Sequence, residues 1–385
     1  MPRYGVRVSD FDFDLPEHLI AQHPRERGKS RLLVVDRRLG RWQESRVADL
    51  PAWLRAGDLL VANDSRVFPA RLLGKRQPGG GQAECLLLEE LGGGERKRRR
   101  ESFYEMPNDM DPVKRFPTSF SDSELIWWSL VNPGAKLQPG ATIDFSNPDR
   151  APGITLAGEI IEVDSIGRRL VRLTATGATV ADAIDKLGHI PLPPYIRRPD
   201  TDDDRIRYQT MFARHVGSIA APTAGLHFDE TLVAALDNAG IRRATVTLHV
   251  GYGTFKPVKV EDTRDHRVDA ESWEVSPETA AAIAETRAAG RRIVAVGTTT
   301  TRALESAALD TGIVTAGREA TELCITPGYE FRAIDGLLTN FHLPRSSLLM
   351  LVAAFAGRDL VLAAYRDAIA REFAFYSYGD AMLIL

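Results

Sequence analysis

The chain has 385 residues, of which 44% are hydrophobic and 26% charged, so it exceeds one ordinary domain and has the composition of a globular protein. A formal net charge of −3 does not indicate a nucleic-acid-binding protein, and two distant cysteines without a CxxC spacing argue against a zinc or iron–sulfur centre. Because no apolar run of about 18 residues and no leader-like start are present, we expect a soluble, cytoplasmic protein without membrane contact.

The first 70 residues are predicted to contain two strands rich in branched apolar residues, Leu32 to Asp36 and Leu59 to Ala62. The second strand ends in the polar turn Asn63-Asp64-Ser65-Arg66. This turn is either the lip of a site or a plain Asx turn, and its position does not separate the two.

Residues 71–176 have a different character, with short β-like runs between turns rich in Gly and Pro. The runs are Ala83 to Leu88, Leu125 to Leu130, Thr142 to Phe145, Thr155 to Val163 and Arg169 to Ala175. Strands at this spacing predict a small antiparallel β-barrel. We therefore expect a layered α/β domain made of residues 1–70 and 177–385, with the barrel inserted as a second domain. The basic run from Arg96 to Arg100 either holds phosphates or is a solvated loop.

In the last part of the chain, helices and strands alternate, which is typical of a layered α/β domain. A predicted helix begins after Asp229 and ends at Gly240, and a strand covers Ala244 to Val250. His227 precedes this helix and His249 belongs to the end of this strand. Element ends are where α/β folds place their sites, although a packed histidine explains each residue when it is taken alone.

Several common cofactor motifs are missing. Gly251-Tyr252-Gly253-Thr254 follows a strand but lacks the third glycine of a dinucleotide fingerprint. The sequence also lacks a P-loop, a GxSxG elbow and the Gly-rich loop of class I methyltransferases. The histidines are too scattered to predict a metal site.

Other polar residues lie at predicted element ends. GTTTTRALES, at 297–306, follows a strand and opens a helix, so it is either an anion-binding helix N-terminus or an ordinary turn. Asp265-His266 with Glu271 is either an acid–histidine pair or a surface ion pair. His342, among Phe, Leu and Pro, is interpreted as a packed core histidine.

Together these segments resemble the S-adenosylmethionine:tRNA ribosyltransferase-isomerase family of queuosine biosynthesis over nearly the whole chain. The resemblance is carried by FDFDLPEHLIAQHP, GDLLVANDSRVFPARLLG, HIPLPPYIRRPD, YQTMFARHVGSIAAPTAGLHFDE, VTLHVGYGTFKPV, DHRVDAE, VGTTTTRALES, PGYEFRAIDGLLTNFHLP and FYSYGDAMLI. The chain departs from the family at Asp269, where a histidine is usual, and in the longer, more polar loop that runs to Asp122.

The resemblance implies that the ribosyl part of S-adenosylmethionine is transferred to 7-aminomethyl-7-deazaguanine at the tRNA wobble position. The ribose isomerises to give epoxyqueuosine, while adenine and methionine leave. S-adenosylmethionine is then a substrate, with no metal or further cofactor, and the partner is the anticodon loop of tRNA. The implied fold is an α/β domain with an inserted β-barrel, and we expect a monomer.

The chemistry of this reaction suggests roles for individual residues. A base must remove a ribose C5′ hydrogen beside the sulfonium, and we assign it to His227 or His266, oriented by Asp265 or Glu271. The methionine carboxylate needs a cation or a helix N-terminus. Residues expected to bind S-adenosylmethionine are His249, Gly251, Gly253, Thr254, Phe255, Thr298, Thr299 and Arg302.

A wobble base must be unstacked and held by aromatic or guanidinium groups. We expect Tyr195, Arg197 and Arg198 in the Pro-rich loop, together with Arg66, to contact tRNA. Two alternatives are a non-catalytic RNA-binding protein that uses the barrel and a tRNA methyltransferase. The barrel segment lacks closely spaced stacking aromatics, and the methyltransferase loop is missing, which disfavours both.

Overall fold

A computed structural model of the protein describes residues 6–91 and 122–385. Internal contacts divide the chain into two compact units, Met1–Val67 with Leu192–Leu385, and Phe68–Pro191. The basic run from Arg96 to Arg100 lies outside the described residues. The domain limits at residues 70/71 and 176/177 remain a prediction.

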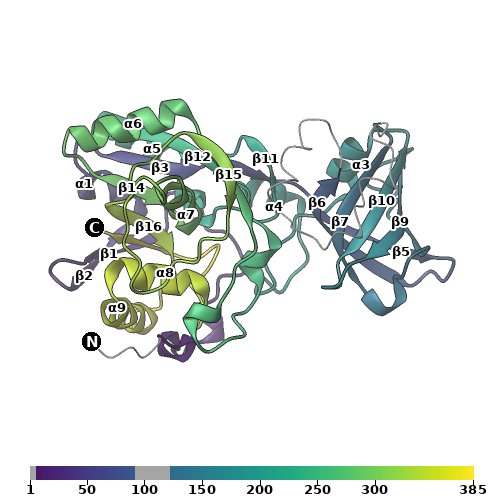
Figure 1. Ribbon diagram of the computed structural model, residues 1–385, viewed down its shortest axis with the longest axis horizontal. Coiled ribbons are helices and arrows are strands. Elements are labelled where there is room, and N and C mark those ends of the chain that lie inside the picture. Colours follow the sequence, from purple (N-terminus) through teal and green to yellow (C-terminus); the bar gives the residue numbers. More distant parts are fainter. Residues whose placement is uncertain (1–5, 92–121) are drawn as a thin grey trace. The chain divides into compact units, whose positions relative to one another are not determined.

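The first unit is built on one nine-stranded sheet (Figure 1). Its spatial order is β15 (Gly317–Thr321), β13 (Glu271–Val275), β12 (Arg242–Leu248), β3 (Leu59–Asn63), β14 (Ile293–Val296), β16 (Gly336–Asn340), β17 (Ala381–Ile384), β1 (Arg31–Asp36) and β2 (Arg41–Arg46). The four central strands β12, β3, β14 and β16 are parallel to one another, whereas β13 runs antiparallel to β12 and β17 antiparallel to β16. β1 is parallel to β17.

The sheet is covered by helices on both faces, as a sheet with a parallel centre requires. Strand β3 is buried along its whole length, and its side chains alternate between two hydrophobic clusters. Leu59 and Val61 pack with the helices of one face, and Leu60 and Ala62 pack with those of the other. The first face carries α6 (Pro277–Ala288), α7 (Thr298–Ala307), α8 (Ser347–Ala356) and α9 (Arg358–Ala370). The second face carries α1 (Leu50–Trp53) and α5 (Glu230–Asn238).

Helix boundaries follow local sequence signals. The Asp229 carboxylate accepts the Leu232 N–H at 2.7 Å and caps α5, and Gly240 follows the helix with φ +71°. Among the described residues, no single helix is long and apolar enough to span a membrane. Helices α8 and α9 reach that length only as a pair bent by 114°. The predicted layered α/β architecture is confirmed.

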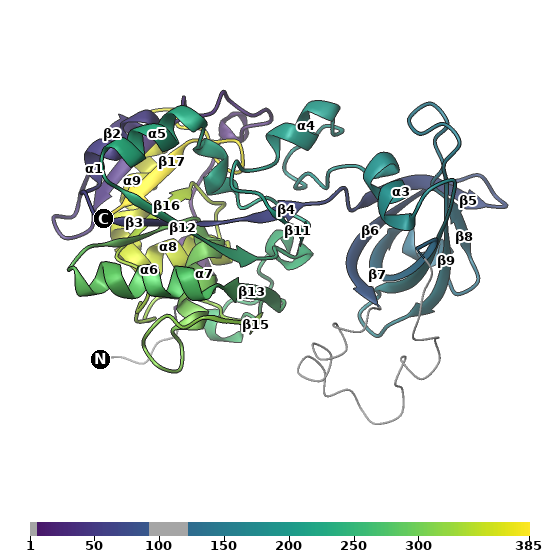
Figure 2. The same cartoon turned by 90° about the horizontal axis from the view of Figure 1, so that it is seen from above.

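The second unit is a closed barrel of six antiparallel strands, which Figure 2 shows from above. Its order is β10 (Arg169–Thr176), β7 (Glu124–Asn132), β6 (Gln82–Leu91), β5 (Arg71–Gln77), β8 (Thr142–Asp144) and β9 (Thr155–Val163). Closure leaves no free strand edge, and helix α3 (Val180–Leu187) adds Val180, Ile184 and Leu187 to the barrel core. The predicted antiparallel β-barrel is confirmed.

The polar turns that follow β3, β12 and β14 lie at one edge of the large sheet. The parallel strands β12, β3, β14 and β16 all end there. Since β17 is antiparallel to β16, and β1 is parallel to β17, these two strands begin at the same edge. Ligands of open α/β sheets bind outside the carboxyl ends of the strands. We call this edge the carboxyl edge, and the candidate site is sought there.

Candidate active site at the carboxyl edge of the sheet

The turn after β3 joins that strand to β12. The Asn63 amide nitrogen donates to the Leu248 carbonyl at 2.9 Å, and its oxygen accepts the N–H groups of Leu248 and Ser65 at 3.1 and 3.0 Å. The Asp64 carboxylate accepts the Thr247 hydroxyl at 2.7 Å. The hydrogen bond from the Ser65 N–H to the Asn63 side chain closes an Asx turn. The turn therefore stabilises the end of β3, whether or not it also borders the site.

His249, at the end of β12, packs over a glycine. Gly217 in β11 (His215–Ser218) has φ +150°, and a Cβ atom there would lie 2.8 Å from His249 Nδ1. Strand β11 pairs with β4 (Ser65–Val67), whose Arg66 side chain is exposed. The glycine therefore lets the imidazole approach the backbone closely at the carboxyl edge.

A buried ion pair joins β13 to α7. Glu271 and Arg302 are 4% and 8% exposed, and their side chains form a salt bridge. The other Glu271 oxygen accepts the Gly251 N–H at 2.9 Å and the Thr254 hydroxyl at 3.1 Å. Arg302 Nε also donates to the Leu323 carbonyl at 3.0 Å. The structure thus brings Glu271 to Arg302 and to the glycine-containing turn, and most Arg302 donors are already engaged.

The turn into α7 presents a free helix N-terminus. Gly297, with φ +95°, is the N-cap residue and has no side chain to cap the helix. Thr300 and Thr301 donate their hydroxyls to carbonyls one turn back, at 2.7 and 3.1 Å. Thr298 is buried, and the hydroxyl oxygen of Thr299 is buried without a hydrogen-bond partner in the described structure. Unbonded N–H groups and a spare hydroxyl at a helix start suit an anionic group.

His227 lies at the end of the 3₁₀ helix Thr223–His227 and is 4% exposed. The Asn340 amide nitrogen lies 3.0 Å from the Tyr376 carbonyl and 3.2 Å from His227 Nε2. Because a carbonyl only accepts, the amide nitrogen faces both groups, Nε2 accepts, and Nδ1 carries the proton toward Ser30 Oγ at 3.0 Å. Burial, and then the Arg25 charge, lower the pKa of His227 to about 4, so the ring is neutral near pH 7.

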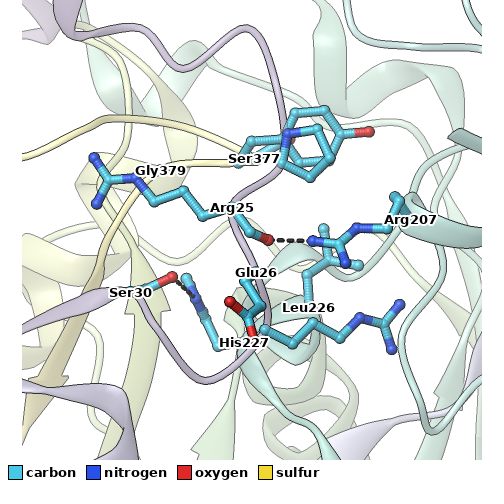
Figure 3. Close-up of a pocket in the computed structure, with 11 residues that line it drawn as sticks. Arg25, Glu26, Ser30, Arg207, Leu226, His227, Ser377 and Gly379 are labelled. Atoms are coloured by element: carbon cyan, nitrogen blue, oxygen red, sulfur yellow. Dashed lines mark hydrogen bonds between the residues drawn. The ribbon is translucent and has the colours of Figure 1, made fainter. Parts of the chain in front are cut away.

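His227 forms the wall of a small pocket in the first unit, shown in Figure 3. The pocket is lined by Pro24, Arg25, Glu26, Arg27, Ser30, Arg207, Leu226, His227, Ser377, Tyr378 and Gly379. One Arg25 nitrogen donates to buried Asp380 at 2.7 Å, and the Arg25 carbonyl accepts a bond from Arg207. Except for His227, none of these residues was expected at the site. The basic segment before β1 was visible in the sequence, but its position beside β17 depends on the sheet order.

The Pro-rich loop meets this region through Tyr195. Its hydroxyl lies 2.6 Å from Ser377 Oγ, and its ring centroid lies 4.0 Å from that of Tyr376. Arg198 makes two bonds of 2.7 Å to buried Asp204. Burial alone would raise the pKa of Asp204, but hydrogen bonds from Arg198 and Thr201 lower it to about 2.

Arg198 is therefore held in an internal ion pair. Arg197 differs, because its side chain is 71% exposed and pairs with Glu17, whose side chain is 73% exposed. Of the three loop residues expected to contact tRNA, Arg197 is exposed, whereas Tyr195 is partly buried against Tyr376 and Ser377.

His266 and Asp265 precede β13, which lies on the opposite side of β12 from β3, so both residues are near the carboxyl edge. His266 is partly buried, and burial followed by the Arg267 charge lowers its pKa. Asp265 is exposed, and no hydrogen bond joins its carboxylate to the His266 ring in the part of the chain described. Asp269 pairs with Lys256 at 2.6 Å and lies against Gly253, where an added Cβ would be 2.7 Å from its carboxylate oxygen.

Two further expectations concern histidine packing and metals. His342 is buried, and its Nε2 lies 2.9 Å from the Thr339 hydroxyl. Burial lowers the pKa of His342 to about 3, as for the packed core histidine that we predicted. Across residues 6–91 and 122–385, no group of three or more His, Cys, Asp or Glu side chains is placed to hold a metal ion.

The first unit thus has a layered α/β fold with a polar carboxyl edge, the edge where folds of this class commonly bind ligands, and the inserted barrel is a second unit. The family model described as queuosine biosynthesis protein matches residues 8–384, and the chain belongs to this family.

Named relatives extend the match over the full length. The chain is 47% identical over 380 residues to the S-adenosylmethionine:tRNA ribosyltransferase-isomerase of Anaeromyxobacter sp. (strain Fw109-5), covering 98% of this chain and 99% of the relative. It is 45% identical to the same-named protein of Symbiobacterium thermophilum, covering 99% and 100%. The crystal structure of S-adenosylmethionine tRNA ribosyltransferase from Thermotoga maritima is 34% identical, with a TM-score of 0.51 and coverage of 98% and 100%.

Proposed function

We propose that the protein is an S-adenosylmethionine:tRNA ribosyltransferase-isomerase. It transfers the ribosyl group of S-adenosylmethionine to 7-aminomethyl-7-deazaguanine at the wobble position and forms epoxyqueuosine, adenine and methionine. The observation that carries the proposal is the 47% identity over nearly the whole chain to a relative of that name. S-adenosylmethionine serves as a substrate, and we propose that no further cofactor takes part.

We assign the proton-abstracting base to His266. Its ring is partly buried and makes no hydrogen bond to a described residue, and the lowered pKa keeps it unprotonated near pH 7. His227 is less suited to this step, because both of its nitrogens are engaged and burial opposes a charged imidazolium. His227 is then a positioning residue that holds the turn before β1 and the end of β16 together. Asp265 would orient His266 only after its exposed carboxylate turns inward.

We place the adenosine of S-adenosylmethionine along His249, Gly251, Gly253, Thr254 and Phe255. The methionine carboxylate is assigned to the N-terminus of α7, at Thr298 and Thr299, whose backbone and spare hydroxyl are suited to an anion.

Arg302 then acts indirectly. Its guanidinium is occupied by Glu271, and Glu271 fixes the positions of Gly251 and Thr254. The expected carboxylate contact of Arg302 and the catalytic role of Glu271 become positioning roles in this proposal.

For tRNA, we propose that Tyr195 stacks with the unstacked wobble base and that the exposed Arg66 and Arg197 contact the anticodon loop. Arg198 instead braces the loop through Asp204. We further propose that the protein acts as a monomer in the cytoplasm.

The reaction type is tested with two labelled substrates. An RNA stem-loop that carries the modified guanine is incubated with S-adenosylmethionine labelled either in the ribose or in the methyl group. Ribosyl transfer puts only the ribose label into RNA and releases one adenine per label. Methyl label in the RNA indicates a methyltransferase, and RNA binding without incorporation indicates a non-catalytic RNA-binding protein.

A further inference from the structure

The pocket beside His227 concentrates positive charge. Three of its lining side chains are arginines, Arg25, Arg27 and Arg207, which come from the turn before β1 and from the end of α4 (Asp202–Arg207). Arg27 and Arg207 are partly buried, and each lies within the electrostatic influence of the other. Burial, followed by the Arg207 charge, lowers the pKa of Arg27. Two like charges are thus held close together at a partly dehydrated position.

Neither guanidinium group forms a salt bridge with a described carboxylate, although the negative charge of Asp229 acts on Arg27 from a greater distance. Arg27 donates to the carbonyls of Ile206 and Gln209, and Arg207 donates to the carbonyl of Arg25. Among the described residues, no carboxylate lies within 4.0 Å of either group. Carbonyls fix the positions of the guanidinium groups without neutralising them, and Asp229 compensates the Arg27 charge only from beyond salt-bridge distance. Partly buried charges are costly without a close partner.

The remaining pocket walls add little negative charge. His227 is neutral near pH 7, and its neighbours Ser30 and Ser377 carry hydroxyl groups that can donate to an oxyanion, whereas the Tyr378 hydroxyl donates to Asp204 at 3.0 Å. The one lining carboxylate, Glu26, is exposed. Asp380 is buried beneath, where it pairs with Arg25.

We propose that this pocket binds a phosphodiester group of the tRNA backbone through Arg27 and Arg207. The inference rests on the proposed function and adds a contact that fixes where the RNA strand crosses the carboxyl edge. A guanidinium pair matches the oxygens of a phosphate, and neutral hydroxyl groups complete the set of donors.

The charge of the competing ligand favours RNA. The methionine part of S-adenosylmethionine carries a carboxylate, but an ammonium and a sulfonium lie beside it, so the molecule is a net cation near pH 7. A net cation is repelled by Arg27 and Arg207, which form no salt bridge with a described carboxylate. A polyanion gains from the same cluster and releases counterions on binding.

The experiment measures equilibrium binding of a fluorescent anticodon stem-loop to the full chain, without S-adenosylmethionine, at several salt concentrations. The variants are R27Q, R207Q, the double variant and R27K. The matched control is R243Q, because Arg243 is a surface arginine at the amino end of β12 that pairs with exposed Asp237. S-adenosylmethionine binding and thermal unfolding are measured in parallel for each variant.

We expect the double variant to bind the stem-loop roughly tenfold or more weakly at low salt. The slope of log K against log salt should become shallower by about 0.7 to 0.9 for the lost phosphate contact. R27K should keep most of the slope, R243Q should match the unchanged protein, and S-adenosylmethionine binding should not change.

An unchanged slope in a double variant that still folds would overturn the inference, as would weaker S-adenosylmethionine binding with normal RNA binding. The inference would also be overturned if R27K bound the stem-loop as weakly as R27Q and both variants had a lower unfolding temperature. Arg27 would then act only in folding. Failure of the unchanged protein to bind the stem-loop would instead contradict the proposed function.

Discussion

Removing the Glu271 carboxylate should destabilise the first unit strongly. The side chain is 4% exposed and accepts three interactions, from Arg302, the Gly251 N–H and the Thr254 hydroxyl. Breaking a buried ion pair by removing one partner costs about 3 to 5 kcal/mol. Arg302 keeps the Leu323 carbonyl at 3.0 Å, so we expect the lower end for E271A, about 3 kcal/mol.

The assay is urea unfolding followed by tryptophan fluorescence. Trp273 lies two residues from Glu271 on the same strand and is 5% exposed, so its emission reports on this part of the sheet. The matched control is E274A. Glu274 is on the same strand, but its side chain is 50% exposed and lies 3.5 Å from the exposed Arg318. E274A should lower the free energy of unfolding by less than about 0.5 kcal/mol.

A second comparison separates the charge from the hydrogen bonds. E271Q keeps an acceptor for Gly251 and Thr254 but removes the negative charge, so it should restore part of the loss. The E271A/R302M double variant removes both charges, and it should be more stable than E271A because no uncompensated cation remains buried. Equal losses for E271A and E274A, or a double variant no more stable than E271A, would refute the reasoning.

Three other changes test separate parts of the site. The pKa of His227 is about 4 in the folded chain against an ordinary 6.5, so the unfolded chain binds more protons between these values. The contribution of neutral His227 to the free energy of unfolding should be fully present above pH 6.5 and should decrease by about 3 kcal/mol as the pH drops to 4. If the free energy of unfolding of H227Q, measured in urea, decreases just as steeply over this range, the prediction is contradicted. G217A should displace the His249 ring, because the added Cβ would lie 2.8 Å from Nδ1; the dissociation constant of S-adenosylmethionine should rise, and an unchanged constant would remove His249 from the site. H266A should slow single-turnover adenine release by about a hundredfold or more while RNA binding stays normal, and a near-normal rate would exclude it as the base.

Local signals in the sequence were sufficient for much of the fold. The strand from Leu59 to Ala62 was predicted from its run of apolar residues, which reflects burial on both faces. The start of α5 followed from the capping group of Asp229 and its end from Gly240. Five of the six barrel strands were predicted to within a few residues from the turns rich in Gly and Pro between them, whereas β5 (Arg71–Gln77) was not predicted.

The contacts within the site depend on residues that are distant in sequence. Glu271 was expected beside His266, but its partner Arg302 is 31 positions along the chain and reaches it only after α7 packs on the sheet. The arginine pocket needs the turn before β1 and the segment before β17 to meet. That meeting follows from the parallel pairing of β1 with β17, which single-sequence patterns do not encode.

The most direct measurement is mass spectrometry of an anticodon stem-loop with 7-aminomethyl-7-deazaguanine, after incubation with the full chain and S-adenosylmethionine. We expect the RNA to gain the mass of the ribosyl-derived epoxycyclopentanediol group, with one free adenine and one free methionine for each modified RNA. A gain of one methyl group, or an RNA that binds but keeps its mass, would contradict the proposed ribosyltransferase-isomerase activity.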